Sequence, residues 1–240
     1  MKPFAPPPDP AVLVTYWQQY CTYRQSTSAT DPLVLASWQR CMPLLSPDSS
    51  LSPNDSTRLQ QAVGTIDGLL RNLARPVIED IYQYTESAEI ALLVLNQNLT
   101  VIDLIGHPKM VQSVRPMGAD LGLSLEEPYV GTTAFGIVQH ERIPAWVYGA
   151  EHFLRAFHPL SSSAAPIYSH DGELLGILGI MEPAAEASVR SMGIVTAGVR
   201  AIESQIEADA AQQEATTRAI QINTIIDSIS DGVLAWDQHR

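Results

Sequence analysis

The stretch from Ile90 to Ile105, which reads IALLVLNQNLTVIDLI, decides the fold class. Its first part, Ile90 to Leu95, is a short apolar run of the kind that forms a buried β-strand. Asn96, Gln97 and Asn98 interrupt the run with residues that favour a turn, and Leu99 to Ile105 predicts a second strand. The segment is therefore predicted to be a β-hairpin.

Further strands are predicted downstream of this hairpin. Ile143 to Tyr148 alternates as a strand, and Ala164 to Tyr168 and Leu174 to Ile180 form an antiparallel pair joined by a turn at His170, Asp171 and Gly172. Residues 106–130 show no clear period, so we predict a loop there with at most one helical turn, followed by a short helix from Gly131 to Gln139. The centre of the chain is predicted to be an α+β domain with an antiparallel sheet.

Helical patterns flank this centre on both sides. The first residues contain five prolines, which predicts a mobile tail. Apolar residues then recur at helical spacing, including a longer helix that starts near Asn54 or Asp55 and is bent or interrupted at Pro76. The expected organisation is a tail at 1–10, a helical region at 11–86, an α+β domain at 87–183, a long helix at 184–228 and the start of another domain at 229–240.

The long helix carries an apolar stripe with spacings of three and four residues, at Met192, Val195, Val199, Ile202 and Ile206. This spacing predicts the seam of a parallel two-stranded coil and hence a homodimer. Packing of the same stripe against the chain's own sheet is an equally probable alternative for the first half of the helix. The second half has less sheet to cover, although Arg218 interrupts its seam.

Composition excludes several classes of function. The formal net charge of -12 opposes contact with nucleic acid or with anionic membranes. Cys21 and Cys41 have no metal-ligand spacing, so we expect free thiols and neither a metal nor another cofactor. The longest apolar run has six residues, far below the roughly 20 of a spanning helix. A cytoplasmic location is the resulting expectation.

Several short motifs occur in a fixed order along the chain, and together they carry more information than any one of them. They are Ser37-Trp38-Gln39-Arg40-Cys41, Leu93-Val94-Leu95-Asn96, Gly131-Thr132-Thr133-Ala134-Phe135-Gly136, Pro144, Gly149-Ala150-Glu151-His152-Phe153, Ser161-Ser162-Ser163-Ala164-Ala165-Pro166-Ile167 and Asp171-Gly172-Glu173-Leu174-Leu175-Gly176.

In this order and spacing the motifs resemble the N-terminal GAF sensory region of the acetoin and dihydroxyacetone operon activators, which are enhancer-binding transcriptional regulators. The similarity spans roughly residues 33–181. The chain departs from the family at Thr133, where Asn is usual, and at Ser162, where Cys is frequent, so chemistry that needs that thiol is absent. Residues 222–236 resemble the opening helix and first strand of a PAS domain.

Candidate ligand-binding residues cluster in the motifs of the second half. Thr132 and Thr133 precede a predicted helix and could present backbone amides to an anion, although a capped turn is at least as probable. Ser162 lies in the predicted strand that follows. Trp146 could stack on a ligand, but aromatic residues in strands more often pack in the core.

Glu151 and His152 are candidates for a polar pair at a pocket mouth, and the pattern favours the alternative, a helix start satisfied by hydrogen bonds. One Glu and one His without a nucleophile specify no reaction, so the chain is predicted not to be an enzyme. We interpret Trp38 and Arg40 as an anchor, with the indole buried and the guanidinium on a carboxylate or carbonyl.

The predicted function is a sensory module that binds a small metabolite or a regulatory protein and relays the signal through the long helix to downstream domains. The alternatives are a protein interaction scaffold without a small-molecule ligand, and the sensor input of a histidine kinase or phosphatase. A ligand pocket is expected between the sheet and residues 118–149, because long loops over a rigid sheet are frequent binding sites.

Overall fold

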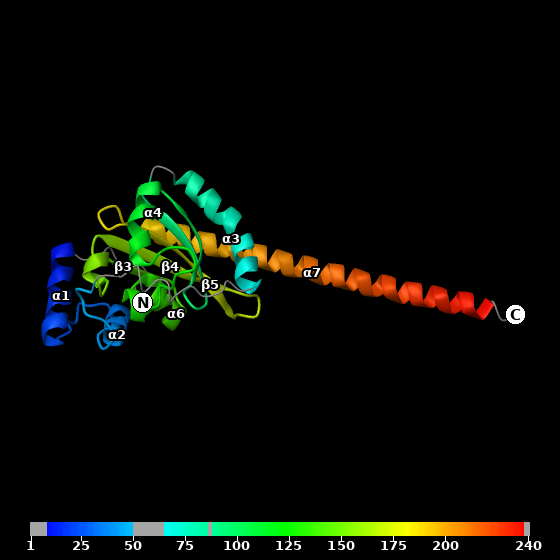
Figure 1. The fold of residues 1–240 in the computed structure, drawn as a ribbon, viewed down its shortest axis with the longest axis horizontal. Helices are drawn as coiled ribbons and strands as arrows, with labels where there is room; N and C mark the ends of the chain where they lie inside the picture. The colour runs from blue at the N-terminus through cyan, green and yellow to red at the C-terminus, as the bar shows by residue number, and fades with distance from the viewer. Residues whose placement is uncertain (1–8, 50–64, 86–87, 238–240) are drawn as a thin grey trace.

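The computed structural model describes the backbone of residues 9–49, 65–85 and 88–237, and the side chains of these residues except 65, 66 and 227–237 (Figure 1). The predicted tail, apart from Asp9 and Pro10, and the predicted helix start near residue 54 lie outside the described residues. Among the described residues no helix is both long and apolar enough to cross a membrane.

The centre of the molecule is a five-stranded antiparallel sheet in the order β2-β1-β5-β4-β3. The predicted hairpin is present as β1 and β2, and the predicted pair is β4 and β5 with their bounds extended outward. The strand bounds are β1 Ala91–Asn96, β2 Val101–Gly106, β3 Ala145–Tyr148, β4 Leu160–Tyr168 and β5 Leu174–Pro183. β1 and β5 are the pair that joins the two hairpin-like halves.

One face of the sheet carries the two long helices, α3 (Thr65–Tyr84) and α7 (Val189–Asp237). The even-numbered residues of β5, such as Leu178 and Ile180, point to this helix side. Asp103 on β2 attaches α3 through an ion pair between its Oδ1 and Nη1 of Arg75, at 2.9 Å. Pro76 does not interrupt α3, because buried residues on either side of it keep the helix packed on the sheet.

The other face, here called the loop side, is covered by short helices and by the segments that join them. These are α4 (Pro108–Val114), α5 (Glu127–Val130), α6 (Ala134–Glu141) and the 3-10 turns η2 (Arg115–Met117), η3 (Gly149–Glu151) and η4 (Arg155–Phe157). The prediction of a loop with one turn at residues 106–130 was wrong, since α4, η2 and α5 all lie there. These elements have seven, three and four residues, whereas a helical period of apolar residues becomes recognisable only over roughly 11 or more.

Two N-terminal helices, α1 (Pro10–Tyr23) and α2 (Pro32–Cys41), pack outside the loop side (Figure 1). Both helices begin with the same capping arrangement. The carboxylates of Asp9 and Asp31 accept a hydrogen bond from the second residue after them, and a proline occupies the first helical turn, where its missing amide is not needed.

The helix α7 begins five residues later than predicted and continues through Asp237. Its first part lies in the core: Val195 and Ile202 are fully buried against the sheet and α3. The stripe that predicted a dimer seam is therefore the helix's own core face from Met192 to Ile202, so the alternative of packing against the chain's own sheet is confirmed for that half.

The predicted first strand of a PAS domain, within residues 229–240, is not formed, because α7 is helical to Asp237. A single strand needs a neighbour for its backbone hydrogen bonds, whereas a helix satisfies them internally. No strand in the described part of the chain pairs with these residues.

Candidate functional site

The loop side is organised around the start of α6. Gly131 has a φ of +69°, and a Cβ at this position would meet Leu154 and Phe153 at 3.2 and 3.3 Å, so glycine fits this sharp turn. Thr133 follows as the N-cap, and its hydroxyl accepts a hydrogen bond from the Gly136 amide at 3.2 Å. The predicted capped turn is confirmed.

Ser162 and His152 form a buried polar pair beside this turn. The Ala134 amide donates to Ser162 Oγ at 3.0 Å, and the same Oγ lies 3.0 Å from Nε2 of His152. The other ring nitrogen, Nδ1, lies 3.0 Å from the carbonyl oxygen of Gly149, which can only accept. The hydrogen bonds assign the proton to Nδ1, so Ser162 donates to Nε2 and its hydroxyl is satisfied in both directions.

Burial lowers the pKa of His152 to about 3, so its ring is neutral at physiological pH. The ring also stacks on Phe157 with 5.7 Å between ring centroids. His152 is thus a neutral, hydrogen-bonded core residue in this structure.

Glu151 has other hydrogen-bond partners than its neighbour His152. Its carboxylate accepts a hydrogen bond from the Tyr148 amide at 2.8 Å and closes the η3 turn. Burial raises the pKa of Glu151 to about 7, while the Tyr148 amide opposes that shift. The hydrogen bonds given for the two side chains share no partner, and none joins Glu151 to His152.

Trp146 lies on the opposite face of the sheet from His152 and Ser162. Val147, the next residue on β3, packs in the loop-side core, so Trp146 points to the helix side. Its indole Nε1 donates to Ser161 Oγ at 2.6 Å. The structure therefore places Trp146 away from the loop side, where we expected a ligand pocket.

Thr132 belongs to a second buried cluster that joins α2 to the loop side. The Ser37 hydroxyl donates to Glu127 Oε1 at 2.6 Å, and its oxygen lies 2.7 Å from Thr132 Oγ1, within hydrogen-bond distance. Arg40 donates to both oxygens of the Glu127 carboxylate, at 2.6 and 2.7 Å. Cys41 Sγ lies 3.6 Å from the same threonine hydroxyl.

Two tryptophans complete this attachment of the N-terminal helices. Trp38 Nε1 donates to the carbonyl of Glu151 at 2.7 Å, and Trp17 Nε1 donates to the carbonyl of Phe153 at 2.9 Å. Both indoles are buried. The predicted anchor of Trp38 and Arg40 is confirmed, and its targets are the segment that carries Glu151 and His152 and the helix α5.

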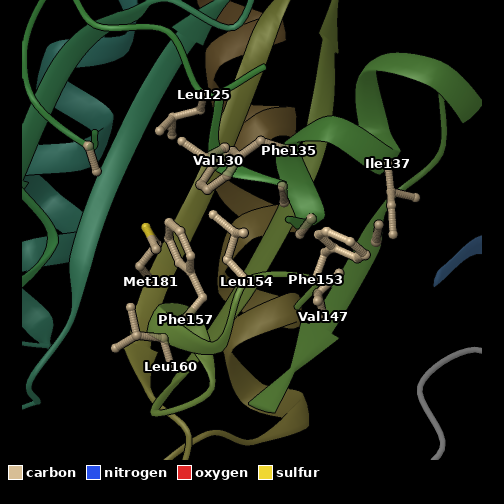
Figure 2. Packing of buried hydrophobic residues seen from close by; sticks show 14 of the residues in the cluster. Leu125, Val130, Phe135, Ile137, Val147, Phe153, Leu154, Phe157, Leu160 and Met181 are labelled. Atoms are coloured by element: carbon tan, nitrogen blue, oxygen red, sulfur yellow. The ribbon is translucent and has the colours of Figure 1, made fainter. Parts of the chain in front are cut away.

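The space between the sheet and the loop side is filled with side chains (Figure 2). Figure 2 shows Leu154 beside the ring of Phe157, and Phe153 near Ile137 and Val147. Phe135 packs so closely on β5 that a Cβ at Gly179 would collide with its ring. A ligand at Ser162 or His152 would have to displace these fully buried residues.

Sequence reasoning missed Ser37 and Glu127 as members of this site. Ser37 was visible in the motif Ser-Trp-x-Arg-Cys, but nothing in the sequence indicated which acidic residue Arg40 would reach. Among the described residues no group of three His, Cys, Asp or Glu side chains could hold a metal ion.

The sheet, the pair α3 and α7 on one face and the short helices on the other define a class of small α+β sensory domains. The family model described as GAF domain matches residues 69–206, more than half of the chain. The chain belongs to the GAF family.

Similar proteins are bacterial operon regulators. The chain is 22% identical over 207 residues to the glycerol metabolism operon regulatory protein of Citrobacter freundii, covering 86% of this chain and 32% of that protein. It is 33% identical over 141 residues to the acetoin dehydrogenase operon transcriptional activator AcoR of Bacillus subtilis, covering 59% and 23%. The chain thus spans about a third or less of these relatives.

A solved structure with the same fold is the DhaR(N)-DhaL complex of E. coli, with a TM-score of 0.72 and 21% identity. The match covers 81% of this chain and 66% of that chain. The GAF region of operon regulatory activators, expected from the motifs, is confirmed by these comparisons.

Proposed function

We propose that this chain is the sensory module of a bacterial transcriptional regulator, that a partner protein supplies its input, and that α7 relays the signal to downstream domains. The observation that carries the proposal is the division of α7 into two parts. Val195 and Ile202 are buried in the domain core, whereas Ile222 and Ile225 are 57% and 59% exposed on the part that leaves the body (Figure 1).

A helix shared between a core and an output is suited to relay. Its 49 residues give it a length of about 70 Å, at about 1.5 Å per residue. A change in how α3 and the sheet hold its first part would move its far end by leverage, because the backbone hydrogen bonds make the helix stiff. Relay thus needs no flexible linker within the described helix.

A partner protein fits the input better than a small metabolite does. The loop-side interior is filled, and the hydrogen bonds of Ser162 and His152 are already made within the chain. The relative with the same fold was solved with DhaL bound to it. The attachment of α1 and α2 offers an outer surface that a partner could contact without entering the core.

The ligand roles predicted for Thr132, Thr133, Trp146, Glu151, His152 and Ser162 stay predictions. A metabolite at the loop side is the second candidate function, and the specific feature that favours it is the polar pair of Ser162 and His152 inside an otherwise apolar layer. A scaffold without a ligand, and an input domain of a kinase or phosphatase, would share the same fold.

A titration tests the input directly. Calorimetry of the chain with a DhaL-type protein encoded in the same genome should give a saturable complex, and light scattering should show its mass. Acetoin, glycerol and dihydroxyacetone should leave the melting temperature unchanged. If one of these metabolites raises the melting temperature while the DhaL-type protein gives no complex, the partner proposal is wrong and the metabolite candidate replaces it.

Relay has its own measurement. A spin label at Thr216→Cys in a Cys21→Ser background should report a changed environment or label distance on partner binding, since Cys41 is buried and will not be labelled. An unchanged spectrum in a saturated complex would contradict relay through α7.

We also propose a cytoplasmic location, a homodimer and the absence of enzymatic activity.

A further inference from the structure

A pocket lies on the helix side of the sheet, opposite to the face that holds Ser162 and His152. It has a volume of about 500 Å3 and lies between the end of α3, the ends of β1 and β5, and the first turns of α7. Ile90, Ile180 and Ile194 supply apolar walls. The volume is within the range of small-molecule sites, which is roughly 300 to 1,000 Å3.

One ionisable side chain is placed in the wall of this pocket by the period of β5. Glu182 follows Leu178 and Ile180 on the helix side of the strand, where the core is otherwise apolar. It is only 5% exposed, and its Oε1 has no hydrogen-bond partner among the described residues. A buried carboxylate oxygen without a donor is costly, so a ligand that brings a donor would gain the energy of satisfying it.

Among the described residues no ion pair joins Glu182 to a cation, although Arg190 lines the same pocket. Glu186 lies in the turn before α7 and adds like charge, and Arg190 on the first turn of α7 donates its Nε to Ser188 Oγ at 3.3 Å. Tyr84 is the titratable residue of α3 at the pocket. Burial raises the pKa of Glu182 to about 7, and the charge of Glu186 adds to this shift. Hydrogen bonds from the Ser191 hydroxyl and the Ser188 backbone oppose it, as does the charge of Arg190.

We propose that this pocket binds a small primary ammonium compound with a short branched aliphatic body. The ammonium group would donate to Glu182, and the aliphatic body would lie against Ile90, Ile180 and Ile194. An ammonium donor makes a charge-assisted hydrogen bond to a carboxylate, which is stronger than the bond from a neutral hydroxyl. An anionic ligand would be repelled by Glu182 and Glu186.

The position of the pocket gives such a ligand a regulatory consequence. The ligand would touch the end of α3, the end of β5 and the start of α7 at once, so it would fix α7 where that helix leaves the sheet. This site differs in place and chemistry from the partner input proposed above, and it does not depend on it.

Isoamylamine is the probe, with isoamyl alcohol and isovalerate as its neutral and anionic counterparts. Amide NMR titration of the whole chain with the amine should give saturable shifts at Ile90, Ser191 and Ile194. The alcohol should bind about tenfold more weakly or worse, and isovalerate should not bind. Because the amine stays protonated from pH 6 to 8, its affinity should rise over that interval as Glu182 ionises.

Two variants and a control complete the test. Glu182→Gln keeps the shape of the side chain but should lower amine affinity by about tenfold and remove the rise with pH. Ala88→Leu should lower the affinity by filling the pocket. Glu173→Gln, an exposed change in the turn between β4 and β5, should leave it unaltered.

Melting curves must show that each variant is folded. The proposal is overturned if the amine gives no saturable shift, if the amine and the alcohol bind equally, or if folded Glu182→Gln binds the amine as wild type does.

Discussion

At the scale of the residue, the contact between Arg40 and Glu127 matters most for the attachment of the N-terminal helices. Glu127 is 4% exposed and depends on Arg40 and Ser37 for its hydrogen bonds. Arg40→Met keeps most of the side-chain volume but removes the guanidinium from a buried carboxylate, which then has Nε2 of His140 at 3.7 Å as its nearest basic group. We expect the free energy of unfolding to fall by roughly 3 kcal/mol, the lower end for buried pairs, because Arg40 is 31% exposed.

Urea denaturation measures this loss. The matched control is Lys109→Met, which removes a surface ion pair with Glu89 and should change the free energy by less than ~0.5 kcal/mol. Equal effects of the two substitutions would show that the Arg40 contact does not hold the N-terminal helices in place.

Glu151 predicts a dependence of stability on pH. Its pKa is about 7 when folded and 4.5 in its ordinary state, so the native state binds more protons and stability is lost as the pH rises through about 7. The pKa of His152 is shifted in the opposite direction, to about 3. Its contribution to stability therefore grows as the pH rises, but only up to its ordinary pKa of 6.5. Between pH 6.5 and 8 the fall caused by Glu151 is therefore not offset by His152.

The variant Glu151→Gln keeps an oxygen for the Tyr148 amide but does not titrate. Its free energy of unfolding, measured in urea at pH 6.5, 7 and 8, should fall less over this interval than that of wild type. Glu182, whose pKa is also raised to about 7, leaves some of the fall in place. If the free energy of unfolding of Glu151→Gln falls with pH as steeply as that of wild type, the raised pKa of Glu151 is contradicted.

Residue types were easier to predict than residue directions. The anchor of Trp38 and Arg40 was predictable because an indole and a guanidinium have few ways to be satisfied in a core. The direction of Trp146 was not, since the register of β3 places it on the helix side and only long-range pairing with β4 sets that register. Glu182 had no signal beyond being an acidic residue at the end of an apolar strand.

At the scale of the element, α7 joins a core helix to an exposed one. Ile202 is fully buried, so Ile202→Asp removes an apolar side chain and buries a charge without a partner. The domain should lose at least ~4 kcal/mol of stability, from the lost burial alone at roughly 2 to 5 kcal/mol plus the charge. The substitution therefore tests the domain core, and not the dimer seam that the spacing of the stripe predicts.

Thermal unfolding shows whether Ile202→Asp destabilises the domain core. Gln205→Asp, an exposed change one turn away on the same helix, is the control and should melt like wild type. A folded Ile202→Asp protein with an unchanged melting temperature would mean that the stripe does not lie in the core.

Elements with a strong period were predicted and elements without one were not. All five strands follow apolar runs or alternation, and α7 follows a long stretch without proline. α4 and α5 have seven and four residues, too few to show a hydrophobic period. Packing against the apolar core of the loop side stabilises them, with Met110, Val114 and Val130 buried there. The seam of α7 was ambiguous because the same three and four spacing suits a sheet and a partner helix.

At the scale of the whole molecule, the domain and the projecting helix have different surfaces. The domain buries its stripe internally, whereas the projecting part of α7 exposes Ile220, Ile222, Ile225 and Ile226. In this part the residues Ala208, Ala211, Ala215, Arg218, Ile222 and Ile225 recur at spacings of three and four. This series is a candidate seam for two parallel helices, distinct from the buried one.

We therefore expect any homodimer of this chain to form through the projecting part of α7. Ile225→Asp places a charge in the candidate seam without touching the domain core, so it should give a monomer that melts like wild type. Thr217→Asp changes an exposed residue outside the seam and should remain dimeric. Light scattering at high micromolar concentration measures both masses. A wild-type monomer at that concentration would rule out the seam, and a dimer that survives Ile225→Asp would place the interface elsewhere.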